Sequence, residues 1–245
     1  MCGIVGLFAK SQEIEHDLGT HLSAMLVQMS DRGPDSAGVA VYRDPVPAGH
    51  AKLTLFSTDR HEPWDGLADD LRETLSTLAR TMGHGTHALG HTRMATESRV
   101  TTEGSHPFST GLDLCVVHNG SLSNHNRLRQ SLRREGIEFR TENDTEVAAG
   151  YLAWRLREGA TLEEALEGCL DDLDGFYTFL CGTADGFAVL RDPIACKPAV
   201  LAETDAWVAM ASEWRAIAVL PGAADARMWE PEPGVVYVWE KAAVA

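Results

Sequence analysis

The residue with the greatest chemical potential is Cys2, which directly follows the initiator Met1. Removal of Met1, which is favoured before a small side chain, would leave Cys2 with a thiol nucleophile and a free α-amine on one carbon. The amine has an ordinary pKa of about 7.7–8.0, so it can accept the thiol proton near neutral pH. A nucleophile activated by its own amine is suited to acyl transfer. The alternative is that Cys2 is a small residue entering a buried strand.

Several polar segments interrupt otherwise apolar stretches and could supply partners to such a nucleophile. They comprise residues 32–36, 90–96, 118–120 and 143–146. Each also has a purely structural interpretation. Asn119 and Gly120 form a favourable turn dipeptide, and Asp144 is a suitable helix N-cap. Arg93 could be a solvated charge at the end of a strand, and Arg32 could pair with Asp35.

The elements that must position these residues follow from the hydrophobic periodicity. We expect strands at Gly3–Ala9, 36–43, 51–57, 88–96, 112–118, 176–182, 187–191, 198–202, Trp207–Ala211 and 235–240. We expect helices at 17–30, 65–82 and 144–156, one capped by Asn124, and one that starts with a capping box of Thr161 and Glu164. Each helix has one apolar face that needs a sheet to cover. The predicted fold is therefore α+β, a four-layer α-β-β-α sandwich of two mainly antiparallel sheets.

Composition and charge narrow the classes of partner. The 245 residues carry a net charge of −15, which argues against nucleic acid and anionic membranes. The five cysteines show no paired spacing, which favours reduced thiols in the cytoplasm. We find no signal peptide and no apolar stretch long enough to cross a bilayer. No linker divides the sequence, so we expect a single domain over residues 1–245.

Taken together and in this order, the segments resemble those of the class II, or N-terminal-nucleophile, glutamine amidotransferases. The matching stretches are CGIVG, RGPDSAG, GHTRMAT, HNGSLSN, NDTE, the DG of residues 174–175, RDPIACKP from Arg191 and ASE from Ala211. They cover nearly the whole sequence and are similar to the glutaminase domains of glucosamine-6-phosphate synthase and of phosphoribosyl-pyrophosphate amidotransferase. The resemblance implies the N-terminal-nucleophile hydrolase fold.

The resemblance also implies a catalytic role for each matching residue. Cys2 would attack the side-chain amide carbon of glutamine, and its α-amine would pass the thiol proton to departing ammonia. The Asn119 side chain and the Gly120 backbone N–H would stabilise the oxyanion. Arg32 would help to position the Cys2 terminus. A thioester would form, and water would then release glutamate.

Recognition of the free amino acid would fall to a second group of residues. Arg93 would bind the α-carboxylate with its planar guanidinium, Thr96 would support that end, and Asp144 would receive the α-ammonium. The sequence departs from the pattern at two positions of the same segment. Met94 replaces the usual aromatic residue, and Glu97 stands where the sugar-phosphate synthase has histidine.

The sequence contains no synthase region, no phosphate-binding glycine motif and no cluster with metal-ligand spacing. We therefore expect ammonia to pass to a separate protein. The resemblance extends to glutaminase subunits of glutamate-synthase-like complexes, including N-methylglutamate synthase. It implies that the flavin and iron–sulfur cluster reside in partner synthase subunits and that this chain carries no cofactor. The alternatives are an amide or γ-glutamyl hydrolase without ammonia transfer, and a catalytically silent regulatory module.

Overall fold

The computed structural model describes residues 2–42, 53–56, 85–94 and 104–241, and its strands pair into two antiparallel sheets. The larger sheet has the order β10 (Arg227–Trp229), β8 (Val200–Glu203), β9 (Trp207–Ala211), β1 (Gly3–Ala9), β4 (His87–Arg93), β2 (Ser36–Tyr42), β3 (Leu53–Phe56). The smaller sheet has the order β11 (Val236–Glu240), β7 (Gly186–Arg191), β6 (Gly175–Gly182), β5 (Cys115–Leu122). β1 and β4 are therefore internal strands, whereas β5 is an edge strand.

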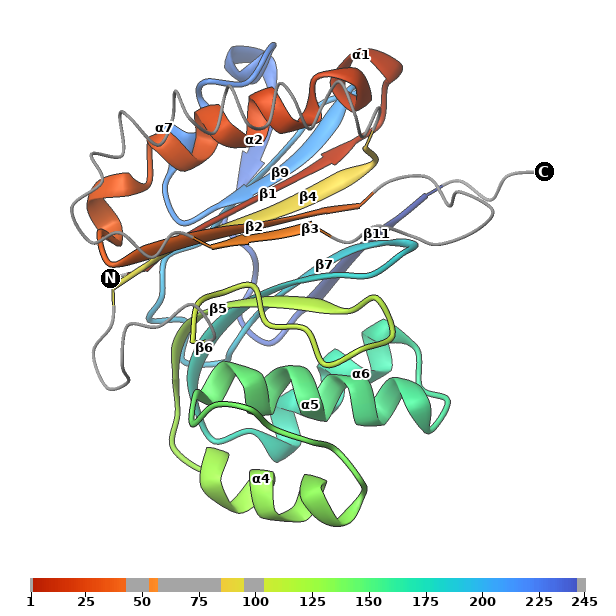
Figure 1. Cartoon of the computed structure of the whole chain (residues 1–245). Coiled ribbons are helices and arrows are strands. Elements are labelled where there is room, and N and C mark those ends of the chain that lie inside the picture. Colours follow the sequence, from red (N-terminus) through yellow and green to blue (C-terminus); the bar gives the residue numbers. More distant parts are fainter. Residues whose placement is uncertain (1, 43–52, 57–84, 95–103, 242–245) are drawn as a thin grey trace.

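Helices cover the outer face of each sheet, which confirms the predicted four-layer α-β-β-α sandwich (Figure 1). The helices on the larger sheet are α1 (Gln12–His16), α2 (Leu18–Val27) and α7 (Trp214–Ile217). Those on the smaller sheet are α4 (His125–Arg134), α5 (Asp144–Arg157) and α6 (Leu162–Asp172). The short 3-10 turns η1 (Ser30–Arg32) and η2 (Ala223–Asp225) complete the described elements.

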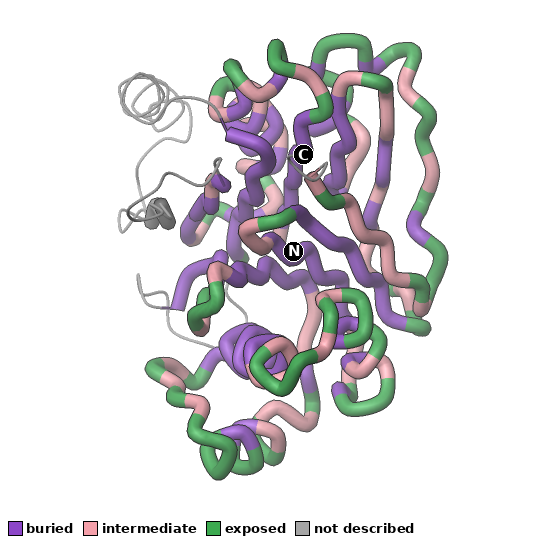
Figure 2. The backbone as a smooth tube through the Cα atoms, turned by 90° about the vertical axis from the view of Figure 1, so that its right-hand side faces the viewer, coloured by how far each residue is buried: buried purple, intermediate pink, exposed green. Residues whose placement is uncertain are grey.

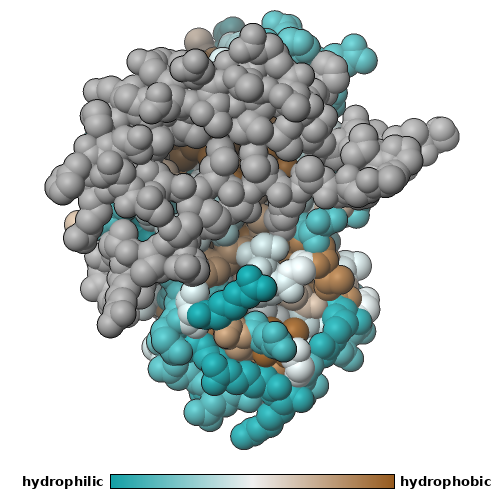
Figure 3. Space-filling view, viewed as in Figure 1, coloured by the Kyte–Doolittle hydropathy of each residue, from teal (hydrophilic) through white to brown (hydrophobic). Residues whose placement is uncertain are grey.

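The sandwich has three apolar layers, one between the sheets and one beneath each set of helices. Alternation along β1 divides its side chains, because Ile4 and Phe8 pack between the sheets whereas Val5 and Leu7 pack against α2. Figure 2 shows the consequence, with buried residues along the central strands and exposed residues in the peripheral loops. The outer surface of α4 is hydrophilic, as Figure 3 shows for this side of the molecule.

Several predicted elements differ from the structure. The strand predicted at 112–118 is β5 at Cys115–Leu122, because residues 111–113 form a turn with positive φ angles. The strand predicted at 198–202 is shifted to Val200–Glu203. Helices α1 and α7 and strand β10 were not predicted, since each is too short for a periodic signal. The predicted helix at 65–82 lies outside the described residues.

Candidate functional site

Cys2 is half-buried at the N-terminal end of β1, and its side chain lies on the face between the two sheets. The register of β1 with β4 pairs Gly3 with Thr92, so Cys2 lies beside the end of β4. The Cys2 thiol lies 3.7 Å from the carbonyl oxygen of Met94. The thiol is thus at the end of the inter-sheet layer, where the apolar core gives way to polar groups.

Asn119 approaches Cys2 from the opposite sheet. It is buried in β5 and lies on the same face of the strand as Cys115 and Val117. The side chains of these two residues pack between the sheets. The Asn119 side-chain amide donates a hydrogen bond to the Cys2 carbonyl oxygen (3.2 Å). Neither Asn119 nor Gly120 forms a turn, because β5 continues to Leu122 in register with β6. The turn interpretation of this dipeptide is therefore wrong.

Gly120 lies on the outer edge of β5, where its backbone groups point away from β6. Val116 identifies this edge, because it exchanges two backbone hydrogen bonds with Phe108 on that side (2.8 and 2.9 Å). Since successive residues of a strand alternate sides, the Gly120 N–H has the same orientation as that of Val116. A side chain is not tolerated here, because a Cβ would lie 2.0 Å from the Phe176 carbonyl oxygen and φ is +154°.

Arg93 ends β4 on the inter-sheet face and is only 4 % exposed. The segment of residues 33–35, which leads into β2, packs directly against the end of β4. The bridge from Pro34 and the hydrogen bond from the Asp35 N–H to the Arg93 carbonyl oxygen (3.0 Å) require close approach, which Gly33 permits. Burial lowers the pKa of Arg93. Electrostatic interactions with Cys2, Asp35 and Asp144 act in the opposite direction and raise this pKa. Arg93 is thus a buried cation within electrostatic range of the thiol.

Asp144 is the first residue of α5. The N-cap of this helix is Asn143, so the interpretation of Asp144 as the N-cap is wrong. The Asn143 side chain accepts from the Thr145 N–H, which leaves the Asp144 carboxylate available to the β5 edge. Its Oδ2 accepts a hydrogen bond from the Leu122 N–H (2.9 Å). Asp144 therefore presents a half-buried carboxylate to the outer edge of the strand that carries Asn119.

Arg32 lies at the end of η1 and does not pair with Asp35, so that interpretation is wrong. Its Nε donates to the Cys2 carbonyl oxygen (3.1 Å) and its Nη1 pairs with Glu213. Arg32 and Asn119 thus hold the same carbonyl oxygen from two sides. Thr96 and Glu97 lie outside the described residues, and Met94 is 46 % exposed.

A cluster of buried histidines lies behind these residues. His91 donates through Nε2 to the His118 carbonyl oxygen (3.1 Å), and its ring stacks on that of His106 at 4.0 Å. The Thr145 hydroxyl lies 2.7 Å from His106 Nε2 and 2.9 Å from His118 Nδ1. Burial lowers the pKa of His91 to about 3 and shifts the pKa of His106 and of His118 in the same direction. The cluster is therefore held neutral.

Sequence reasoning missed the Thr145 hydroxyl and the partner of Arg32. For Glu213 a signal was present, because it ends the ASE stretch that contributes to the resemblance. For Thr145 the only signal was a hydroxyl placed beside Asp144 at the start of a helix.

The remaining cysteines are poor candidates for a nucleophile. Burial raises the pKa of the Cys169 and Cys181 thiols well above the ordinary value, which disfavours the reactive thiolate. Cys115 is fully buried in β5, and Cys196 is exposed in the loop after β7. Among the described residues, no group of three His, Cys, Asp or Glu side chains could hold a metal ion.

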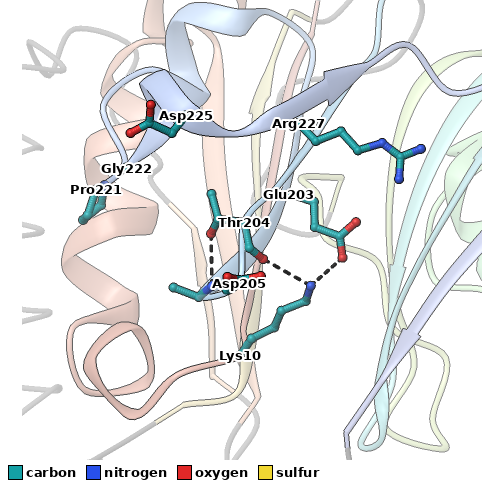
Figure 4. Close-up of a pocket in the computed structure, with 9 residues that line it drawn as sticks. Lys10, Glu203, Thr204, Asp205, Pro221, Gly222, Asp225 and Arg227 are labelled. Atoms are coloured by element: carbon teal, nitrogen blue, oxygen red, sulfur yellow. Dashed lines mark hydrogen bonds and ion pairs between the residues drawn. The ribbon is translucent and has the colours of Figure 1, made fainter.

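A hollow of about 570 Å³ lies at the opposite end of β1 from Cys2 (Figure 4). Lys10, which follows β1, pairs there with Glu203 and donates to the Thr204 carbonyl oxygen (3.2 Å). The remaining lining includes charges of both signs, with Asp225 and Arg227 on separate sides. The hollow is therefore remote from the thiol and lacks a convergent set of groups for a free amino acid.

The thiol at the end of a central strand of an α-β-β-α sandwich defines the architecture of an N-terminal-nucleophile hydrolase. A family model described as a glutamine amidotransferase domain matches residues 91–219. The glutamine amidotransferase-like protein GlxB of Rhizobium meliloti (strain 1021) is 48 % identical, over 98 % of this chain and 98 % of the relative. The chain belongs to the class II glutamine amidotransferases and is an enzyme of the N-terminal-nucleophile type.

Two longer proteins share the same region. The amidophosphoribosyltransferase of Archaeoglobus fulgidus is 30 % identical over 91 % of this chain and 45 % of the relative. The solved structure of glutamine phosphoribosylpyrophosphate amidotransferase from B. subtilis, with ADP and GMP, has a TM-score of 0.73 at 26 % identity. The match covers 98 % of this chain and 47 % of that structure, so the chain spans about half its length. None of the helices in the described residues is long and apolar enough to cross a membrane.

Proposed function

We propose that this chain hydrolyses L-glutamine to glutamate and ammonia through a thioester on Cys2. The observation that carries the proposal is the convergence of Cys2, Arg93 and Asn119 at one end of the inter-sheet layer. A nucleophile, a buried cation and an amide donor from three strands meet there. These groups supply what hydrolysis of a free amino-acid amide requires.

In the proposed reaction the Cys2 Sγ attacks the amide carbon of glutamine while the α-amine takes the thiol proton. The carbonyl oxygen gains negative charge, which the Asn119 side chain and the outward-facing Gly120 N–H stabilise. The C–N bond breaks, and the amine returns the proton to departing ammonia. Water then attacks the thioester, and glutamate and the free thiol are released.

Recognition of the amino-acid end requires groups of both charges. We assign the α-carboxylate to Arg93 with support from Thr96, and the α-ammonium to Asp144. The antiparallel register of β1 with β4 places Arg93 beside Cys2, and the charge of Asp144 acts on the pKa of Arg93, which supports a common site for the three residues. Asp144 already uses one carboxylate oxygen for the Leu122 N–H, so its orientation is set before substrate arrives.

We further propose that ammonia passes to separate synthase subunits, of the glutamate-synthase-like kind that includes N-methylglutamate synthase. The support for this partner is the resemblance to the glutaminase subunits of such complexes, together with the similarity to the glutamine amidotransferase-like protein GlxB over 98 % of both proteins. The flavin and iron–sulfur cluster are assigned to those partners. All five cysteines are free thiols, which supports a reducing, cytoplasmic setting.

The nucleophile can be tested with 6-diazo-5-oxo-norleucine, a glutamine analogue that alkylates it. Peptide mapping should find the adduct on Cys2, and intact mass should show that Met1 is absent. The adduct should disappear in Cys2→Ala and persist in Cys196→Ala, which removes the exposed thiol. Labelling on any other residue, or full glutaminase activity with Met1 retained, contradicts the mechanism.

The partner proposal needs a separate test. Affinity-tagged chain purified from its own cells should bring down synthase subunits that contain flavin and iron, and the complex should aminate an acceptor with glutamine as nitrogen donor. The proposal is contradicted if the chain purifies without any partner and by itself catalyses the amination of the acceptor with glutamine. Rapid hydrolysis of a substituted amide beside undetectable glutamine hydrolysis would instead favour the amide hydrolase.

A further inference from the structure

Glu213 lies at the junction between β9 and α7, and its carboxylate is directed at η1 rather than at its own helix. One carboxylate oxygen pairs with Arg32 Nη1, and the other forms an ion pair with Arg215 Nε (2.7 Å). Although Glu213 is the N-cap residue of α7, its side chain makes no capping hydrogen bond. The carboxylate is therefore committed to two guanidinium groups.

The second of these guanidinium groups leads back to the same turn. Arg215 makes two hydrogen bonds to Asp31 (2.6 and 3.0 Å), the residue next to Arg32 in η1. The Arg32 side chain is only 11 % exposed, whereas Arg215 and Asp31 lie nearer the surface. The network therefore closes around η1 and restricts the Arg32 side chain to one orientation.

From that orientation Arg32 reaches the residue proposed to react. Its Nε donates to the Cys2 carbonyl oxygen (3.1 Å). Ser212, the neighbour of Glu213, holds the next part of the strand. The Ile4 N–H donates to Ser212 Oγ (2.9 Å), and the Ser212 N–H donates to the Ile4 carbonyl oxygen (3.0 Å). Ser212 therefore anchors the chain directly at Ile4, and Glu213 acts on Cys2 through Arg32.

We infer that Glu213 is a positioning residue for the nucleophile, acting through Arg32 on the backbone of Cys2. The inference rests on the proposed function, because it assigns Glu213 to the reaction of Cys2. The hydrogen bond to the Cys2 carbonyl oxygen comes from Arg32, so Glu213 acts on Cys2 at one remove. Its loss would free the Arg32 guanidinium and remove one of the two donors that fix the Cys2 carbonyl oxygen. The thiol and α-amine would then lose their alignment with the substrate amide.

This role predicts a specific kinetic signature for Glu213→Gln. The proposed substrate contacts are made by Arg93 and Asp144, so KM for glutamine should stay within about threefold. Misplacement of a reacting group lowers the rate of the chemical step, so kcat should fall roughly ten- to hundredfold. The rate of Cys2 alkylation by 6-diazo-5-oxo-norleucine should fall in parallel.

The matched control is Glu203→Gln, at the other end of β1. Glu203 pairs with Lys10 (Figure 4). Its side chain is 30 % exposed, compared with 35 % for that of Glu213. Each variant removes one partly exposed carboxylate from an ion pair, with Lys10 in the control and with Arg32 in Glu213→Gln. The control should keep the kcat of the wild-type enzyme, which would separate positioning of Cys2 from a general loss of stability.

Wild-type kcat and alkylation rate in Glu213→Gln, or an equal loss in Glu203→Gln, overturns the inference. Should Glu213→Gln fail to fold, Glu213→Asp keeps the charge but withdraws it by one methylene, and its kcat should still fall at unchanged KM. Wild-type kcat in that variant also overturns the inference. Absence of label on Cys2 in the wild-type chain instead contradicts the proposed function, so the two failures are distinguishable.

Discussion

The side-chain amide of Asn119 donates a hydrogen bond to the carbonyl oxygen of Cys2 (3.2 Å), across the boundary between the two sheets. The same amide is the proposed oxyanion donor. In Asn119→Ala we expect kcat for glutamine hydrolysis to fall about 10²- to 10³-fold, the effect of losing one such donor. The control Gln130→Ala removes an exposed amide from α4. A kcat for Asn119→Ala within threefold of wild type contradicts the assignment.

Gly120→Ala should destabilise the fold as well as the site. The new Cβ would meet the Phe176 carbonyl oxygen at 2.0 Å and the His118 ring at 2.7 Å, so the backbone must move. We expect the free energy of unfolding to fall by about 3 kcal/mol or more. Gly136 also has a positive φ, but a Cβ added there would meet no atom within 4 Å. Gly136→Ala should therefore lower the free energy of unfolding by only about 1 kcal/mol. Urea denaturation measures both, and equal losses would contradict the steric account.

Asp144→Asn should weaken glutamine binding with little change in folding. An amide oxygen can still accept from the Leu122 N–H, but the negative charge proposed to receive the α-ammonium is lost. A charge-assisted hydrogen bond contributes about 1.5–3 kcal/mol, so we expect KM to rise roughly ten- to hundredfold. Asp172→Asn, which alters the carboxylate that binds Tyr151, is the control. Steady-state kinetics with unchanged KM in Asp144→Asn would remove this residue from the pocket.

Thr145→Val should destabilise the histidine cluster. Its hydroxyl is the shared partner of His106 Nε2 and His118 Nδ1, both buried. Leaving buried polar groups unsatisfied costs about 1–3 kcal/mol of unfolding free energy. Thr145→Ser keeps the hydroxyl and should recover most of that stability. Chemical denaturation compares the two, and equal stability of the Val variant and wild type would exclude a structural role for the hydroxyl.

His87 should make folding stability depend on pH. Burial lowers its pKa to about 3, whereas the unfolded chain takes up a proton near the ordinary pKa of about 6.5. The unfolded state binds more protons between these values, so stability is complete above about pH 6.5 and is lost as pH falls toward 3. We expect His87 to contribute about 1–2 kcal/mol of loss between pH 7.5 and 5.0.

Urea titrations at the two pH values check this expectation. His87→Gln should reduce the loss on acidification, and His16→Gln, at a histidine whose side chain is 68 % exposed, is the surface variant for comparison. An unfolding free energy that is the same at pH 7.5 and 5.0 would contradict the neutral burial of His87.

Local patterns in the sequence were sufficient to predict most of the strands and helices and the layers that they form. The strand at Gly3–Ala9 and the strand at Trp207–Ala211 were predicted residue for residue, because each is a short apolar run that ends at a polar residue, Lys10 and Ser212 respectively. The capping box of Thr161 and Glu164 is present as predicted, since both partners lie within one helical turn. Signals that depend on neighbours in the sequence were therefore sufficient for these parts.

The partners of the polar residues, in contrast, depend on contacts between segments that are distant in the sequence. Arg32 pairs with Glu213, 181 positions away, and not with the nearby Asp35. Asn119 stays within a strand because β6 pairs alongside it, although its sequence with Gly120 favours a turn. Local propensity is worth only a fraction of the free energy of a completed sheet and its buried hydrogen bonds, so contacts distant in sequence set the geometry at Cys2.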